Sequence, residues 1–137
     1  MRSHLTSYLA TGLTFLLLDF VWLALMKDVL YRPHLGELLA DTFQPAPAVA
    51  FYALYAAGIL FFAVSPALAS GRWETALGSG ALLGLIAYGT YDLTNQATLK
   101  GWPAIVTIID TAWGATLTAT AATVGYAVAT WTATTGD

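Results

Sequence analysis

Four long apolar stretches constrain this 137-residue chain more than any other feature of its sequence. A helix that crosses a bilayer needs about 20 mostly apolar residues, because each residue advances the helix by about 1.5 Å. Turn residues or charges separate the stretches, and we expect spanning helices at about 5–27, 48–69, 75–97 and 103–132. The sequence therefore predicts an all-α polytopic membrane protein, with residues 1–137 forming a single four-helix transmembrane bundle.

The composition excludes several classes of protein. Only 9% of the residues are charged, whereas 58% are hydrophobic and the mean hydropathy is +0.67. A soluble domain carries about a quarter charged residues, so the composition excludes a soluble globular enzyme and a disordered chain. The five basic residues are too few and too scattered for a nucleic-acid binder. The chain has no cysteine, which excludes disulfides, thiolate nucleophiles and iron–sulfur clusters.

The first apolar stretch could be mistaken for a signal peptide. It contains Asp19 and Trp22, and it is longer than the usual apolar core of a signal peptide. No clear small-x-small cleavage site precedes the charged pair Lys27 and Asp28. We therefore expect this stretch to be retained as the first spanning helix.

The connection between the first and second stretches has a two-sided pattern for a helix that starts near Pro33. This pattern favours a short amphipathic helix lying in the membrane interface, and the alternative is an ordered loop. The apolar side holds Leu35, Leu38, Leu39 and Phe43, and the polar side holds His34, Glu37, Asp41 and Gln44.

The basic residues give little information on membrane orientation. Four spans would put Arg2 and Arg72 on one side and Lys27, Arg32 and Lys100 on the other. The positive-inside rule needs a larger bias than two against three. Orientation therefore stays open, with a slight preference for cytoplasmic connections between helices one and two and between helices three and four.

Three aspartates lie inside the predicted spans: Asp19, Asp92 and Asp110. An aspartate at the centre of a membrane helix costs about 3 kcal/mol, so three of them need an explanation. Each lies eight residues from a residue expected at the same membrane face, which corresponds to about 12 Å along a helix. These reference residues are Lys27, Lys100 and Trp102. We therefore expect the three carboxylates to share one layer.

Polar and aromatic residues accompany the aspartates at helical spacing. Tyr88, Asp92 and Asn95 follow one another at intervals of four and three, with Tyr91 adjacent, so these side chains project from nearly one face. The first and fourth stretches both contain the pattern D-x-x-W, in which an indole N–H on the same face as the carboxyl can act as a donor. The two tryptophans of this pattern are Trp22 and Trp113.

These residues predict a polar pocket that opens toward the side of the lysines. Closely placed buried acids are expected to titrate as a coupled set, with desolvation and mutual repulsion favouring protonated forms. The pocket would bind a small polar or cationic ligand, a lipid head group, a proton or a cation. The candidate binding residues are Asp19, Asp92, Asp110, Asn95, Tyr88, Tyr91, Trp22 and Trp113, and the candidate rim residues are Lys27, Arg32, Lys100 and Trp102.

Three functions remain open at this point. The first is ligand binding or proton-coupled transport, in which a homodimer would help a chain of only four helices. The second is a structural or accessory membrane subunit, in which the aspartates only fix helix packing. The third is a lipid-modifying enzyme with Asp92 or Asp110 as general base, which is less favoured because no catalytic motif accompanies them.

No metal or cofactor site is predicted. His4 and His34 lie outside the spans and are not paired as haem ligands would be, and the zinc-protease and serine-hydrolase motifs are absent from the sequence. Gly80 and Gly84 form a G-x-x-x-G pattern, which indicates close helix packing rather than a phosphate loop. We expect membrane lipids, and no nucleic acid, among the partners.

Five segments carry a recognisable pattern: Leu18–Leu23, Phe51–Tyr55, Tyr88–Asn95, Lys100–Pro103 and Asp110–Gly114. In these segments the chain resembles a bacterial family of small four-helix predicted membrane proteins of unknown function. The resemblance covers nearly the whole chain in the same order, and Y-D-L-T-N and G-W-P are its most specific parts. It implies four spans and a bacterial inner membrane, and it supplies neither an activity nor catalytic residues.

Overall fold

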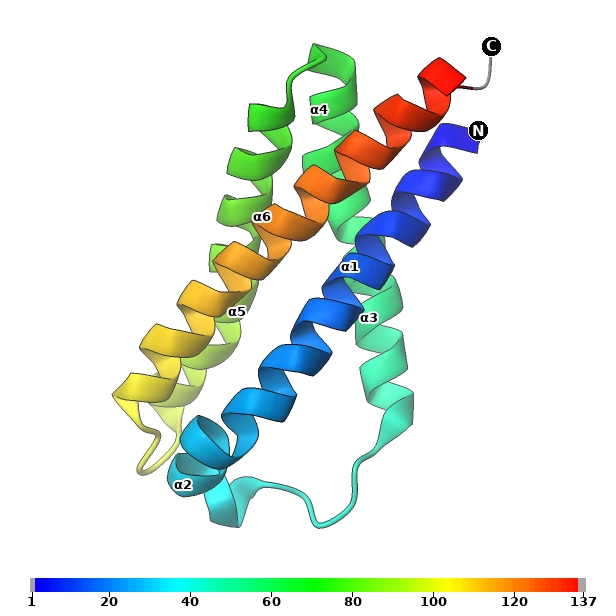
Figure 1. Ribbon diagram of the computed structural model, residues 1–137. Helices are drawn as coiled ribbons and strands as arrows, with labels where there is room; N and C mark the ends of the chain where they lie inside the picture. The colour runs from blue at the N-terminus through cyan, green and yellow to red at the C-terminus, as the bar shows by residue number, and fades with distance from the viewer. Residues whose placement is uncertain (1, 136–137) are drawn as a thin grey trace.

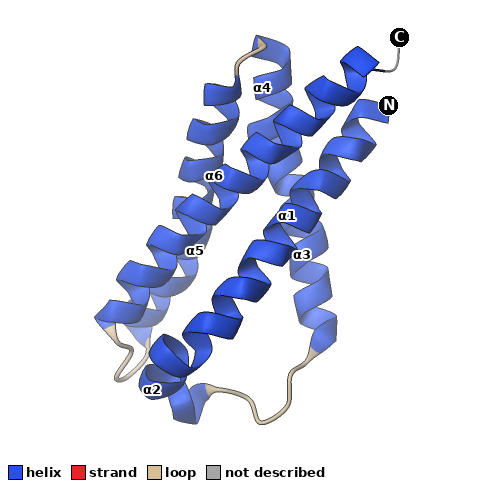
Figure 2. Cartoon of the chain, viewed as in Figure 1, coloured by secondary structure: helices blue, strands red, loops and turns tan. Residues whose placement is uncertain are grey.

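The computed structural model describes residues 2–135, and every regular element of this part of the chain is helical (Figures 1 and 2). Short π- and 3-10 segments interrupt or extend the α-helices at three places. The elements are α1 (Arg2–Met26), the π-helix η1 (Lys27–Tyr31), α2 (Arg32–Leu35), the 3-10 helix η2 (Gly36–Leu38), α3 (Pro45–Ile59), the π-helix η3 (Leu60–Val64), α4 (Ser65–Ser70), α5 (Trp73–Thr98) and α6 (Ala104–Thr135).

All four predicted stretches are helical, and three of them are long and apolar enough to cross a membrane. These three are His4–Leu38, Pro45–Ser70 and Ala104–Thr135 in the described chain. The third predicted span corresponds to α5, which has 26 residues but does not reach the same hydropathy. Glycines and polar residues such as Asp92 and Asn95 lower the hydropathy of α5. The sequence thus predicted where the helices lie. The hydropathy of these helices supports three of the four predicted membrane spans, and the one without this support is α5.

The first helix continues beyond the predicted end at Lys27. It passes through η1, α2 and η2 to Leu38, and the residues from 39 to 44 are not helical. The separate interfacial helix expected from Pro33 onward is therefore not seen in this form. Leu30 and Leu35 explain the continuation, because both are buried against Val106 at the start of α6.

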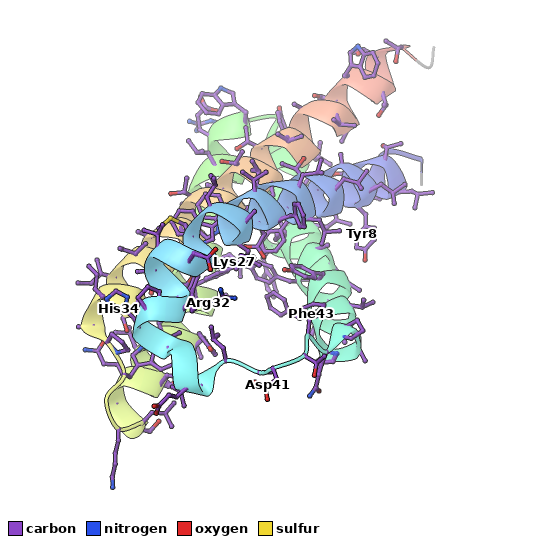
Figure 3. The ribbon with its side chains drawn as sticks, turned by 60° about the horizontal axis from the view of Figure 1, so that its bottom comes forward. Tyr8, Lys27, Arg32, His34, Asp41 and Phe43 are labelled. Atoms are coloured by element: carbon purple, nitrogen blue, oxygen red, sulfur yellow. The ribbon has the colours of Figure 1, made fainter. Side chains whose placement is uncertain are left out.

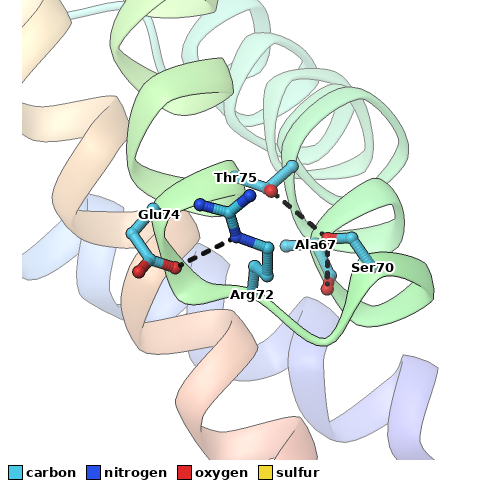
Figure 4. Close-up of polar contacts among 5 residues, drawn as sticks. All are labelled: Ala67, Ser70, Arg72, Glu74 and Thr75. Carbon is cyan, nitrogen blue, oxygen red and sulfur yellow. Dashed lines mark hydrogen bonds and ion pairs between the residues drawn. The ribbon is translucent and has the colours of Figure 1, made fainter.

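The second helix bends without breaking at its proline. Pro66 has no N–H to donate to the preceding turn, and the π-helix η3 ends two residues before it, at Val64. The helix then ends at Gly71, whose φ of +67° is a conformation that glycine adopts without strain. Figure 4 shows the turn into α5, where Ser70 bonds to Thr75 at 3.2 Å and Arg72 pairs with Glu74 at 3.8 Å.

The α5–α6 contact depends on small residues. A Cβ atom on Gly80 would lie 2.9 Å from the Cα atom of Ala119, and one on Gly84 would overlap the carbonyl group of Gly114. A Cβ atom on Gly114 would overlap the ring of Tyr88. The close packing predicted from the Gly80 and Gly84 pair is confirmed, and it lets Tyr88 lie directly against α6.

The α1–α6 contact places both ends of the described chain at one end of the bundle (Figure 1). Ser7 donates a hydrogen bond to the carbonyl oxygen of Gly125 at 3.0 Å, and Tyr55 and Thr118 are hydrogen-bonded at 2.8 Å within the core. The connections from 39 to 44 and from 99 to 103 lie at the opposite end (Figure 1). Lys27 and Lys100 therefore lie at the end that the sequence predicted for both of them.

Candidate functional site

All three aspartates are buried in the bundle. The exposed fraction is 8% for Asp19, 0% for Asp92 and 8% for Asp110. They come from α1, α5 and α6, which pack against one another through α6. Buried carboxylates need hydrogen bonds or opposite charges, because otherwise the loss of hydration is not compensated. The three aspartates differ in how far the bundle satisfies this requirement.

Asp19 has a donor for each of its carboxylate oxygens. The hydroxyl of Tyr52 on α3 donates to Oδ2 at 2.6 Å, and the indole N–H of Trp113 on α6 donates to Oδ1 at 3.4 Å. The carboxylate thus connects three helices. Both donors come from outside α1, so the partners of Asp19 depend on the packing of the whole bundle.

Asp110 is linked to α1 through Tyr31. The Tyr31 hydroxyl donates to Oδ1 of Asp110, and the indole N–H of Trp22 donates to the Tyr31 oxygen at 2.8 Å. Trp22 is also stacked on Trp113, with ring centroids 4.4 Å apart and planes 6° from parallel. The stacked indoles connect the environment of Asp110 with that of Asp19.

Asp92 lies beside the Asp110 carboxyl and the Thr111 hydroxyl. In the described part of the chain, neither of its oxygens has a hydrogen-bond partner, and neither has the Thr111 hydroxyl. Two ionised carboxylates cannot bond to each other, since both are acceptors only. Asp92 is therefore a fully buried acid, and neither of its oxygens has a hydrogen-bond donor among the described residues.

Two tyrosines show that Asp19 and Asp110 belong to one cluster. The phenols of Tyr31 and Tyr88 each lie within electrostatic range of both carboxylates.

A metal site would need several ligand side chains around one ion. Among residues 2–135, no group of three histidine, cysteine, aspartate or glutamate side chains is placed to hold a metal ion. The three buried acids thus form a network of hydrogen bonds around Asp19 and Asp110, with Asp92 beside Asp110.

A pocket of about 280 Å³ lies next to this network, between α3, α5 and α6. Its wall contains one carboxylate, that of Asp110, and is otherwise mostly aromatic or apolar. Tyr88 is held there by its contact with Gly114, and Phe51 is stacked on Tyr55 at 5.2 Å. The lining residues are Phe51, Ala87, Tyr88, Tyr91 and Asp110.

Two further predicted residues lie at the edge of the site. Asn95 is half-buried and lies beside the Tyr91 phenol. Trp102 packs edge-on against Tyr91 at 5.8 Å and donates its indole N–H to Thr107 at 3.0 Å. The Thr107 hydroxyl in turn bonds to the backbone oxygen of Asp92 at 3.4 Å. The contacts of Trp102 therefore lie next to the carboxyl pair.

The predicted basic rim is a separate feature of the surface. Lys27 and Lys100 are exposed, and Arg32 forms an exposed ion pair with Asp28 at 2.9 Å. Figure 3 shows Lys27, Arg32 and His34 on the turns of η1 and α2. Arg32 and Lys100 line a hollow of about 380 Å³ whose lining residues are distinct from those of the Asp110 pocket.

The sequence reasoning missed Tyr31, Tyr52 and Phe51 as site residues. Tyr52 was visible as a phenol within an apolar stretch, and Phe51 precedes it. Tyr31 lay beyond the predicted end of the first helix. Only the continuation of that helix through η1 brings its hydroxyl to Asp110.

A family model described as "Predicted membrane protein (DUF2177)" matches residues 4–127. The chain belongs to this family. The match confirms the resemblance noted from the sequence, and together with the three long apolar helices it indicates a multi-pass membrane protein. No curated protein and no solved structure matches the chain.

Proposed function

We propose that this protein binds a small organic cation within a bacterial inner membrane, with Asp110 as the counter-ion. The observation that supports the proposal is the position of the Asp110 carboxylate in the wall of an otherwise aromatic pocket. A cation over the face of an aromatic ring is attracted by the electrons of the ring, and quaternary ammonium groups are often bound in this way. Phe51, Tyr88 and Tyr91 supply such rings beside one negative charge.

The proposal includes α5 as a fourth spanning helix. Its most polar buried residue, Asp92, faces the other helices, and its glycines Gly80 and Gly84 pack on α6. The large residues that α5 leaves exposed include the apolar Leu82, Leu85, Ile86 and Leu93. An arrangement with polar residues inside and apolar residues outside suits a helix surrounded by lipid. It also agrees with α1 beginning and α6 ending at one end of the bundle (Figure 1).

A structural role is favoured for one of the three acids. Both oxygens of Asp19 are occupied by donors from Tyr52 and Trp113, which leaves this carboxylate little capacity for a ligand. We assign to Asp19 the joining of α1, α3 and α6. Ligand binding is assigned to Asp110, which contacts the pocket.

Calorimetry on the full chain in lipid nanodiscs tests the proposal. Benzyltrimethylammonium is a suitable probe because its charge does not change with pH, and neopentylbenzene is its neutral isostere. We expect the cation to bind and the isostere to bind at least about tenfold more weakly. Asp110→Asn should weaken binding of the cation by about 10- to 100-fold, since a charge-assisted interaction is lost.

The matched control is Asp41→Asn, which removes the same charge from an exposed position in the connection before α3. This variant should bind the cation as the wild type does. Equal binding of the cation and its isostere, or an unchanged affinity in Asp110→Asn, would refute the proposal.

A further inference from the structure

Asp92 lies beside Asp110, because Thr107, one turn before Asp110 on α6, bonds to the backbone oxygen of Asp92 at 3.4 Å. This arrangement suggests how occupation of the pocket is regulated. Asp110 contacts the pocket, whereas Asp92 is fully buried and is not among the residues that line it. Both Asp92 oxygens lack a hydrogen-bond partner among the described residues. A proton placed on one of the two carboxyls would turn it into a donor to the other. One shared proton would therefore satisfy an acid that the protein itself leaves unsatisfied.

We propose that Asp92 and Asp110 share one proton when the pocket is empty and release it when a cation binds. This inference rests on the proposed function of the pocket and adds its regulation by pH. A cation beside Asp110 favours two ionised carboxylates, because it lowers the repulsion between them. The O–H bond of the shared proton then breaks, its electron pair stays on the carboxylate, and the proton passes to water. Uptake of one positive charge is thus balanced by the loss of another.

The hydrogen bonds around the pair agree with this assignment. The Tyr31 hydroxyl donates to Oδ1 of Asp110, which favours Asp110 as the acceptor and Asp92 as the partner that carries the proton. Asp19 is stabilised separately by Tyr52 and Trp113. The ionisable side chains around the pair come from four elements and are Asp19 on α1, Tyr31 on η1, Tyr52 on α3, and Tyr88 and Tyr91 on α5.

The number of protons released can be measured with the same cationic probe. Titrations of benzyltrimethylammonium are run in two buffers of different ionisation enthalpy at one pH, and are then repeated at several pH values. We expect release of about one proton per bound cation, and an affinity that falls about tenfold for each unit that the pH is lowered. Asp92→Asn should still bind the cation, because its amide can donate to Asp110, but its binding should release no proton and should lose the dependence on pH.

Asp19→Asn is the control, since it changes an acid of the same cluster whose oxygens are already hydrogen-bonded. Proton release should persist in this variant. If the wild type binds the cation without releasing a proton, proton sharing is wrong while the binding function stands.

An infrared measurement without ligand, on the wild type and on Asp92→Asn, separates the two proposals. The empty protein should show the carbonyl band of a protonated carboxylic acid, and this band should disappear as the pH is raised. A folded Asp92→Asn protein should lack the band. If the band is present but the cation does not bind, the proposed function fails and the proton-sharing pair stands. A wild-type protein without the band overturns the inference.

Discussion

Trp113 donates its indole N–H to Asp19 on another helix, at 3.4 Å, and not to Asp110, which lies three residues before it on α6. Trp22 behaves similarly, because it donates to Tyr31 and not to Asp19 on its own helix. Of the two stacked indoles, Trp113 therefore donates from α6 to α1, whereas Trp22 donates to η1, the continuation of its own helix. The D-x-x-W pattern brings a donor to the correct layer, and helix packing determines which oxygen receives it.

Removing the hydroxyl of Tyr52 should destabilise the bundle. Tyr52→Phe leaves one oxygen of the buried Asp19 carboxylate without its donor at 2.6 Å. We expect a loss of about 1–3 kcal/mol in the free energy of unfolding, measured by denaturant titration in micelles. Tyr8→Phe is the control, because the Tyr8 hydroxyl makes an exposed bond to the Ala53 carbonyl at 3.2 Å. A larger loss in Tyr8→Phe would contradict the structural role of Asp19.

Adding a methyl group at the α5–α6 contact should be costly. In Gly84→Ala the new Cβ atom would overlap the Gly114 carbonyl group, so the helices must separate. Overpacking of this kind costs about 1–3 kcal/mol of stability. A Cβ atom added to Gly78 on the same helix would meet no other atom within 4 Å, and Gly78→Ala should instead be neutral or stabilising by about 0.5–1 kcal/mol. Equal effects of the two substitutions on thermal unfolding would argue against the close contact.

The ends of α5 should lie on opposite sides of the membrane. Because the chain has no cysteine, single cysteines can be introduced without removing native ones. Arg72→Cys and Lys100→Cys should react with a membrane-impermeant maleimide from opposite sides of a vesicle. Leu85→Cys, from the exposed apolar face of α5, should react only after the membrane is dissolved. Labelling of Arg72→Cys and Lys100→Cys from the same side would exclude α5 as a span.

The ion pair between Arg32 and Asp28 should contribute little. Its N–O distance is 2.9 Å, but the side chains are 66% and 58% exposed, so water competes for both charges. We expect Asp28→Asn to change the free energy of unfolding by no more than about 1 kcal/mol in the same denaturant titration. A loss as large as that of Tyr52→Phe would show that this end of the first helix is more strongly coupled to the bundle than its exposure indicates.

The sequence by itself located the helices, because apolar length and turn residues are local properties of the chain. It also identified Asp19, Asp92 and Asp110 as the acids that need an explanation. Each lies within an apolar stretch, where an aspartate facing lipid would be costly, so the sequence predicts that all three face the interior.

Only the tertiary structure decided what each acid contacts. Tyr31 and Tyr52 reach Asp110 and Asp19 from helices that are distant in sequence. The first helix continues past Lys27 because Leu30 and Leu35 pack against Val106. Helix packing also explains why Asp92 has no hydrogen-bond donor among the described residues, because α6 places a second carboxyl, that of Asp110, beside it. Such contacts depend on how helices rotate and pack against each other, and no periodicity within a single helix specifies them.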